Sequence, residues 1–295
     1  TKGKIKDWEK SYKTMKEPLY KELPLAVLIN QSSASASEIV SGTIQDLDRG
    51  VVLGKKSFGK GLVQQTRKLS YNSQLKVTVA KYYTPSGRCI QALDYTNKND
   101  DGSVGKVADS LKTAFKTRNG RTVYDGGGVD PDIVINQEAF AKIVGSLVSK
   151  QLIFDFATEF VLQNDSIDAP GIFKISDALY EDFVMFLSDK EYEYETKTEK
   201  KMAELINEAE DEYADFKEDL EVLQKKLLSF KKDDIHKYQS QVSELILSEL
   251  MARYYYQEGR VIASLADDTV LKEAISVLHD SDRYEAILSG NLDDK

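Results

Sequence analysis

The segment 24–30, Pro-Leu-Ala-Val-Leu-Ile-Asn, decides the fold class of this 295-residue chain together with the 23 residues that follow it. Its five apolar residues, 25–29, lie between a proline and an asparagine, as is typical of a buried parallel strand. After the small residues of 31–37, an amphipathic stretch, 38–47, places five side chains on one helical face: Ile39, Val40, Thr43, Ile44 and Leu47. A second apolar run, 51–53, follows at once, so the sequence predicts a strand–helix–strand unit of the α/β class.

The rest of the chain divides into a loop-rich part and a helical part. We expect a third strand over 74–83 and a last one over 129–135, with 94–128 mostly loop apart from a short helix near 110–116. From about residue 137 the pattern is helical, and 197–232 is dense in Glu and Lys at i, i+4 spacing. The predicted parts are an N-terminal arm or connector (1–20), an α/β core (21–139) and a helical C-terminal domain (140–295).

Composition excludes several classes of protein. The chain is 41% hydrophobic and 30% charged, as in ordinary globular proteins, and its formal net charge of -9 argues against a nucleic-acid partner. A single cysteine, Cys89, excludes an intrachain disulfide, and with only two histidines we expect neither a metal site nor a cofactor. The apolar runs are too short to cross a bilayer.

The stretch 31–38, Gln-Ser-Ser-Ala-Ser-Ala-Ser-Glu, lies where the first strand turns into a helix. Backbone N–H groups at a helix N-terminus lack intrahelical acceptors, and the helix dipole is positive there. A serine at this position can attack a carbonyl while a neighbouring N–H stabilises the developing oxyanion. The alternative is structural, because Ser35 and Glu38 also have the spacing of a capping box, which is far commoner than a nucleophile.

The stretch 57–64, Ser-Phe-Gly-Lys-Gly-Leu-Val-Gln, supplies a candidate base. Lys60 lies between two glycines and beside apolar side chains, which would remove water from the amine, lower its pKa and let it accept a proton near neutrality. No carboxylate lies within six residues of Lys60, and neither histidine is in this half of the chain. A Ser/Lys pair is therefore the economical arrangement. The alternative is a surface lysine in a glycine-rich turn.

Six motifs follow one another between residues 22 and 135: segments 24–30, 33–39, 45–46, 54–64, 80–91 and 128–133. Together they closely resemble the carboxy-terminal processing, or tail-specific, serine proteases. The resemblance implies a ClpP/crotonase-like core of ββα units, with Ser35 as nucleophile, Lys60 as general base, Gln64 orienting that lysine and the N–H of Ala36 as an oxyanion donor. The usual glycine before Ser33 is Ser32 here.

The same resemblance implies an endopeptidase that cleaves protein or peptide substrates near accessible C-termini, in a bacterial cell envelope and most naturally the periplasm. The family's PDZ domain, signal segment and N-terminal part of the core have no counterpart in these residues. We therefore expect a fragment, 21–139 being the C-terminal part of the catalytic core, with little activity alone.

Two other functions stay open: a non-catalytic peptide- or ligand-binding module on the same fold, and a helical region that serves dimerisation or adaptor docking. A homo-oligomer, an adaptor and membrane association through parts outside this chain are likewise left open.

Three lesser features have structural interpretations that we prefer. Tyr82, Tyr83 and Arg88 could border a peptide groove, but alternate positions of a strand more often pack. Three acidic residues, Asp125, Asp130 and Asp132, lack the regular spacing of a calcium loop. We expect Cys89 to behave as a small apolar residue.

Overall fold

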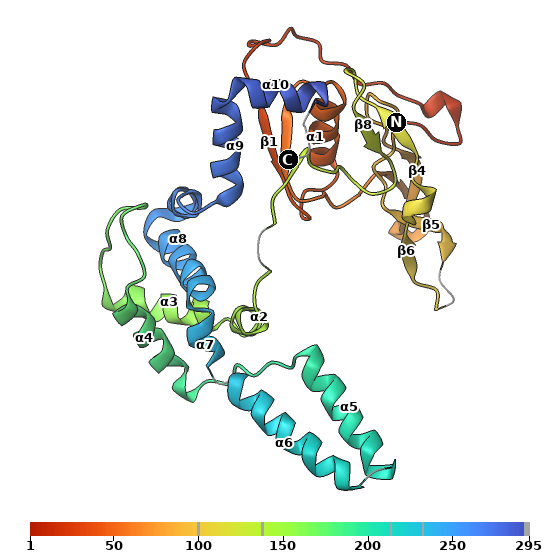
Figure 1. Cartoon of the computed structure of the whole chain (residues 1–295). Helices are drawn as coiled ribbons and strands as arrows, with labels where there is room; N and C mark the ends of the chain where they lie inside the picture. The colour runs from red at the N-terminus through yellow and green to blue at the C-terminus, as the bar shows by residue number, and fades with distance from the viewer. Residues whose placement is uncertain (99–100, 137–138, 213, 232, 292–295) are drawn as a thin grey trace. The chain divides into compact units, whose positions relative to one another are not determined.

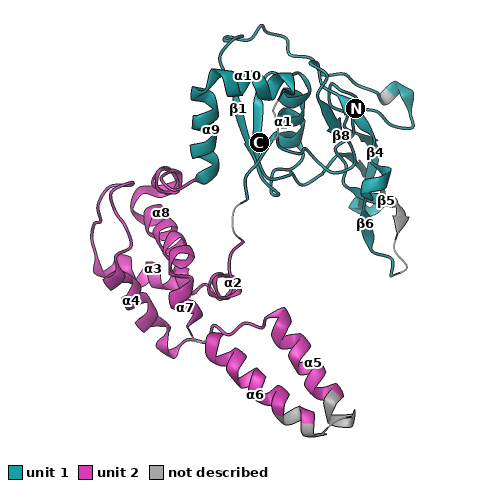
Figure 2. Ribbon diagram, in the orientation of Figure 1, with its two compact units in different colours: residues 1–137, 269–295 teal, residues 138–268 magenta. Residues whose placement is uncertain are grey.

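The computed structural model describes every residue except 99–100, 137–138, 213, 232 and 292–295. The described chain forms two compact units (Figure 2): residues 1–137 with 269–295, and residues 138–268.

The first unit is built on a three-stranded parallel sheet in the order β1-β2-β9. Its strands are β1 (Ala26–Ile29), β2 (Val51–Gly54) and β9 (Ile133–Val134), and α1 (Ala36–Asp46) connects the first two (Figure 1). Ala26 is paired with Val51 and Ile29 with Gly54. This confirms the predicted α/β class. However, β1 is an edge strand, and Leu28 is 41% exposed. The expectation of a buried strand at this position is therefore wrong.

Successive side chains of β2 point to opposite faces of this sheet, and helices cover both faces. Val52 contributes to a cluster with Ile29, Ile90 and Val129 on the face of α1. On the opposite face Val51 and Leu53 pack against α9 (Thr269–His279) and α10 (Ser281–Ser289). The helices that end the chain thus complete the core of its first unit.

Helix α1 buries its polar side, which overturns the amphipathic prediction. Its buried residues are Glu38, Ser41, Gly42, Gln45 and Asp46, whereas Val40 is exposed and Ile39 only half-buried. A Cβ on Gly42 would lie 2.9 Å from Thr84 Cγ2, so a small residue permits the close approach. The buried carboxylates and amide of this face are all hydrogen-bonded or ion-paired, which makes their burial tolerable.

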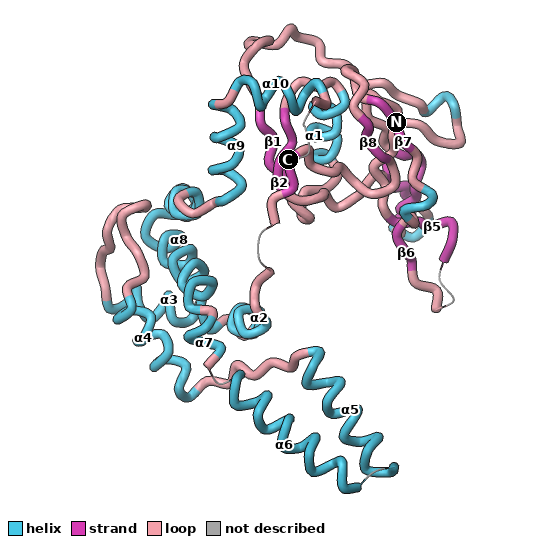
Figure 3. The backbone as a smooth tube through the Cα atoms, in the orientation of Figure 1, coloured by secondary structure: helices cyan, strands magenta, loops and turns pink. Residues whose placement is uncertain are grey.

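Three antiparallel strand pairs flank the sheet (Figure 3). They are β3 (Leu62–Lys68) with β4 (Gln74–Lys81), β5 (Leu93–Lys98) with β6 (Val104–Lys106), and β7 (Ala114–Lys116) with β8 (Thr122–Tyr124). The loop predicted over 94–128 therefore contains four short strands, and a 3₁₀ turn (Asp109–Leu111) followed by β7 replaces the helix expected near 110–116. The arm 1–20 contributes one antiparallel bridge, Lys2 to Lys81.

The second unit is helical, as predicted. Its core contains an aromatic group in which Phe156 packs against Phe183 and Phe186. The helices are α2 (Lys142–Ser149), α3 (Leu152–Gln163), α4 (Asp177–Phe186), α5 (Lys197–Glu212), α6 (Ala214–Lys231), α7 (Asp234–Lys237) and α8 (Gln239–Leu265). Among the described residues no helix is both long enough and apolar enough to cross a membrane.

The division of the chain differs from the predicted domains at one end. We expected 140–295 to form one helical domain, but the second unit ends at residue 268 and α9 and α10 belong to the first. The physical reason is that their apolar side chains, Val270, Ala274, Val277 and Ile287 among them, cover one face of β2.

Candidate active site

Ser35 occupies the N-cap of α1 in an unusual backbone conformation. Its φ of 58° and ψ of -115° lie in a region that L-residues rarely adopt. Such strain costs roughly 1–3 kcal/mol and persists only where surrounding contacts impose it, often at functional sites. Ser35 is half-buried, and the next N–H, that of Ala36, has no acceptor in the part of the chain that the structure describes. A hydroxyl and a free helix-terminal donor therefore come from adjacent residues.

Glu38 holds this turn and the Lys60 turn against each other. Its side chain is fully buried. Oε2 accepts hydrogen bonds from the backbone N–H of Ser35 at 2.9 Å and of Lys60 at 2.8 Å. Oε1 accepts from Ser57 Oγ at 2.5 Å and from the Gly59 N–H at 2.6 Å. One carboxylate thus fixes the nucleophile candidate and the base candidate from two segments that are separate in sequence.

Further backbone contacts hold the same two turns. The Phe58 N–H donates to the Ser33 carbonyl at 3.0 Å, and the Ser57 N–H donates to the Val129 carbonyl at 3.0 Å. Ser57 Oγ accepts from the Val129 N–H at 2.7 Å, so this hydroxyl is used in both directions.

Gly59 is required in the Lys60 turn for two reasons. Its φ is +88°, a conformation that favours glycine. A Cβ there would also lie 2.2 Å from the Ala92 Cβ, which excludes any side chain. A Cβ on Gly61 would lie 2.8 Å from the backbone nitrogen of Gln91, so close packing explains both glycines beside Lys60.

The Lys60 side chain is exposed, so the apolar enclosure that we expected around its amine is absent from this structure. Phe58, one of the residues expected to cover it, is itself 55% exposed. No carboxylate lies within six residues of Lys60 in the sequence, but Glu38 reaches the backbone of Lys60 across the fold. That carboxylate binds the backbone N–H of Lys60.

Gln64 lies on β3, where its side-chain amide donates to Thr78 Oγ1 at 3.3 Å. It also lines a cavity of about 440 Å³ whose walls include Leu62, Leu93, Val107 and Lys81. Gln91 joins this cavity to the Lys60 turn, since its Oε1 accepts from the Gly61 N–H at 2.8 Å. The predicted orienting residue therefore borders a hollow beside the predicted base.

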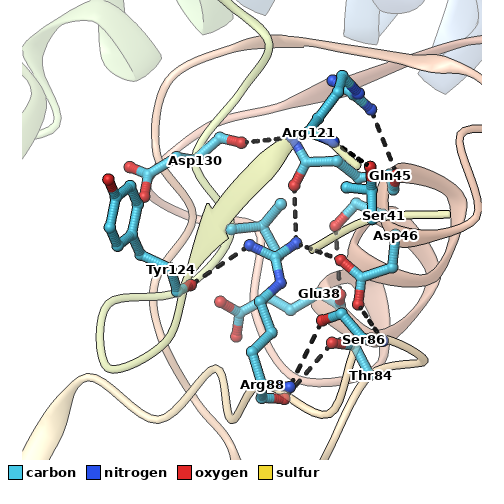
Figure 4. Close-up of polar contacts among 12 residues, drawn as sticks. Glu38, Ser41, Gln45, Asp46, Thr84, Ser86, Arg88, Arg121, Tyr124 and Asp130 are labelled. Atoms are coloured by element: carbon cyan, nitrogen blue, oxygen red, sulfur yellow. Dashed lines mark hydrogen bonds and ion pairs between the residues drawn. The ribbon is translucent and has the colours of Figure 1, made fainter. Parts of the chain in front are cut away.

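A buried polar cluster fixes the other end of α1 (Figure 4). The Arg88 guanidinium, 1% exposed, contacts Asp46 Oδ1 at 2.9 Å and donates to Gln45 Oε1 at 2.7 Å. Burial lowers the pKa of Arg88, and the neighbouring Asp46 opposes that shift. Arg88 is therefore an internal ion-pair partner of α1 and does not border a groove, in agreement with the packing interpretation.

The three acidic residues Asp125, Asp130 and Asp132 have partners within the protein. Asp132 accepts from Arg121 at 2.5 Å and from the Val52 N–H at 2.7 Å, and Asp130 pairs with Lys56 at 2.9 Å. Asp125 accepts from the Thr113 N–H at 2.7 Å. Within the described residues there is no group of three or more His, Cys, Asp or Glu side chains that could hold a metal. Burial raises the pKa of the Cys89 thiol, which keeps it protonated.

The sequence contained one clue to the role of Glu38 that we interpreted too narrowly. Its spacing from Ser35 predicted a capping box, and the Ser35 N–H does donate to its carboxylate. The three additional donors come from 57–60, and no local pattern indicates a contact across twenty residues. A buried acidic residue with several backbone donors could be recognised only after the two turns had been placed.

Comparisons with known proteins give a family match in each part of the chain. Residues 1–103 match the model of peptidase family S41, and residues 143–278 match that of the probable PDZ-protease C-terminal helical domain. The carboxy-terminal-processing protease of Bartonella bacilliformis is 53% identical over 75 residues, which are 25% of this chain and 17% of that protein. The carboxyl-terminal-processing protease of Picosynechococcus sp. is 49% identical over 83 residues, 28% of this chain and 20% of that protein.

Among solved structures, the photosystem II D1 C-terminal processing protease aligns with 38% of this chain and 20% of that chain at 33% identity, with a TM-score of 0.26. The chain spans at most about a fifth of the length of these relatives.

Proposed function

We propose that this chain carries the catalytic residues of a serine endopeptidase. The reason is that it is part of a carboxy-terminal processing protease of peptidase family S41 with the helical domain of PDZ-proteases. Ser35 is the nucleophile, Lys60 its general base, Gln64 the residue that orients Lys60, and the Ala36 N–H an oxyanion donor. The substrates are proteins or peptides cleaved near an accessible C-terminus.

One observation carries the proposal: Glu38 Oε2 accepts from the backbone N–H of both Ser35 and Lys60. Capping alone would need only the Ser35 contact. The additional contact holds the lysine turn at the helix N-terminus, beside a serine in a strained conformation and a helix N–H that has no acceptor among the described residues. This combination supports nucleophilic catalysis over a purely structural role.

In the proposed mechanism the neutral Lys60 amine takes the proton of Ser35 Oγ as this oxygen attacks the substrate carbonyl. The negative charge on the carbonyl oxygen is stabilised by the Ala36 N–H and by the positive end of α1. The C–N bond then breaks, and the protonated lysine returns its proton to the leaving amine. Water attacks the resulting acyl-serine with Lys60 again as base, which releases the acid product and restores Ser35.

Glu38 is a positioning residue in this scheme. It already accepts four hydrogen bonds, and all four donors belong to the two turns that it joins. A carboxylate occupied in this way is suited to fixing geometry and unsuited to taking a proton from Ser35.

We further propose that the isolated 295-residue chain has little activity. The chain spans about a fifth of its relatives, and in this structure Lys60 is exposed while Gln64 donates to Thr78. In the family that this chain resembles, the N-terminal part of the core supplies a second oxyanion donor, which has no counterpart in these residues. Losing one oxyanion donor costs about 10²–10³ in rate, and loss of substrate positioning adds to this. The cell envelope, in particular the periplasm, is the proposed location of the complete protein.

The test is cleavage of an unstructured protein by the complete protein of which this chain is part. Ser35→Ala and Lys60→Ala should each lower the rate by roughly 10³-fold or more, and the double variant should be no slower than either, because the two residues act as a unit. Lys60→Arg keeps a positive charge but cannot supply a neutral base, so it should fail as well.

Matched controls are Ser37→Ala and Lys68→Ala, which alter exposed residues of the same types and should change the rate by no more than about twofold. Cleavage that survives Lys60→Ala within tenfold would reject the assignment of the base. Peptide binding without any Ser35-dependent cleavage would favour the binding-module alternative. Strong Ser35-dependent turnover by the 295-residue chain alone would refute only its predicted inactivity.

A further inference from the structure

The hairpin formed by α5 and α6 leaves part of its own apolar seam uncovered. Five apolar residues of α6 are separated by alternating spacings of four and three, the pattern of a coiled-coil seam: Phe216, Leu220, Leu223, Leu227 and Phe230. Val222 and Leu228 lie outside this series and are exposed as well, at 63% and 45%. Leu220 is buried and Leu227 half-buried, whereas the alternate members Phe216, Leu223 and Phe230 are 50%, 51% and 67% exposed. We call these three residues the outer stripe.

A seam of this kind is fully covered only when helices pack on both of its sides. In this hairpin α5 covers the inner positions, Leu220 and Leu227, and leaves the outer stripe in contact with water. Leu205 of α5 is also exposed, at 43%. The uncovered side chains are large and regularly spaced along about four helical turns, so they fit another helix better than a small molecule.

Charge is segregated along the same hairpin. Residues 204–221, which include the connection between the two helices, contain nine acidic residues and one lysine. The opposite end, 197–201 and 225–232, contains seven lysines and one acidic residue, Glu199. Lys231 binds Glu199 at 2.8 Å, which shows that the start of α5 and the end of α6 lie together. In sequence, the residues on either side of the connection between α5 and α6 are therefore acidic, and we call them the acidic tip; the start of α5 and the end of α6 are basic, and we call them the basic end.

We infer that a second copy of this chain covers the outer stripe, its α5–α6 hairpin packing antiparallel to the first as a four-helix bundle. In this arrangement the acidic tip of each copy lies over the basic end of the other, and a two-fold axis makes the two contacts identical. A parallel arrangement would place the two acidic tips together and is disfavoured by like-charge repulsion. The partner is a second copy because one surface carries both halves of the complementary charge pattern.

Sedimentation velocity of the 295-residue chain over a range of concentrations tests this inference without reference to peptidase activity. The expected result is a monomer–dimer equilibrium that weakens as salt is raised, because salt screens the tip-to-end attraction. Leu223→Glu and Phe230→Glu should each weaken dimerisation by about 30-fold or more. The matched control is Leu162→Glu on α3, a residue 82% exposed outside the hairpin, which should leave dimerisation unchanged.

A charge exchange tests the antiparallel order and does not depend on the apolar variants. One variant converts Lys201, Lys225 and Lys226 to Glu; the other converts Glu204, Glu208 and Asp219 to Lys. Each alone should dimerise more weakly than the unaltered chain, because the net charge of the basic end falls from +6 to 0 in the first variant and that of the acidic tip from -8 to -2 in the second. An equimolar mixture should dimerise better than either variant alone, because the unaltered acidic tip of the first then faces the unaltered basic end of the second. Circular dichroism establishes that each variant keeps its helices.

Three outcomes would overturn the inference: a monomer at all concentrations, two charge variants that fail to associate when mixed, or dimerisation that strengthens with salt. Equal disruption by Leu162→Glu and Phe230→Glu would also overturn it, because the contact would then lie outside the hairpin.

Discussion

Replacing Glu38 with Gln tests whether one carboxylate holds the two turns of the candidate site together. The substitution keeps the size of the side chain but converts one accepting oxygen into a donating NH₂ group. If the NH₂ group replaces Oε2, the Ser35 and Lys60 N–H groups both lose their acceptor. If it replaces Oε1, Ser57 can turn its hydroxyl, but the buried Gly59 N–H still has none.

The magnitude follows from this count. At least one buried backbone N–H loses its acceptor, which costs about 1–3 kcal/mol, and the remaining hydrogen bonds become neutral ones, each weaker by roughly 1 kcal/mol. We therefore expect the substitution to lower the free energy of unfolding of the first unit by about 3–5 kcal/mol. Glu38→Ala should cost more, because all four donors are then left without a partner.

Hydrogen exchange measured by mass spectrometry on peptides that cover 33–41 and 55–62 is the direct assay. A loss of about 3 kcal/mol corresponds to roughly a 150-fold faster exchange where exchange proceeds by opening of this unit. Glu17→Gln is the control, since Glu17 forms an exposed pair with Lys21 and should contribute less than about 1 kcal/mol. Exchange in Glu38→Gln within threefold of the Glu17→Gln control would show that Glu38 does not hold the turns.

Three further predictions concern other parts of the chain. Ser35→Gly should be about 1 kcal/mol more stable than Ser35→Ala in urea denaturation, because glycine adopts a φ of 58° without strain; equal stabilities would mean that Ser35 is not strained. Arg88→Met should cost about 3–5 kcal/mol by leaving the buried Asp46 carboxylate without its cationic partner, against under 1 kcal/mol for the exposed Lys68→Met, and a loss no larger than that control would contradict the ion-pair role. Burial raises the pKa of Glu199, but hydrogen bonds from Lys231 and Thr196 outweigh it and the net pKa lies below the ordinary 4.5. The contribution of Glu199 to stability is therefore complete above its unfolded pKa and is lost as pH falls through the lower folded pKa. Between about pH 5 and 3, the melting temperature of the helical unit should therefore depend less on pH in Glu199→Gln than in the unaltered chain. Equal slopes of melting temperature against pH would refute this.

Short-range patterns were enough to predict the strand–helix–strand unit, the helical second half of the chain and the position of Ser35 at a helix N-terminus. Apolar runs, helical periodicity and small residues act over a few neighbours, and the segments 24–30 and 51–53 form β1 and β2 within a residue or two of their predicted limits. The glycines around Lys60 were likewise visible in the sequence, although their reason, the close approach of Ala92 to Gly59 and of Gln91 to Gly61, was not.

Long-range contacts decided the rest. The buried face of α1 is polar because Arg88, Ser57 and the loop before β9 supply its partners from distant segments, and periodicity alone favoured the opposite face. The last two helices belong to the first unit because β2 offers them an apolar face some 220 residues away in sequence. Four short strands within 94–128 depend on pairing between segments that have little strand pattern of their own. Sequence by itself therefore determined which residues could perform chemistry, and only the tertiary structure determined that one buried carboxylate, Glu38, holds two of them together.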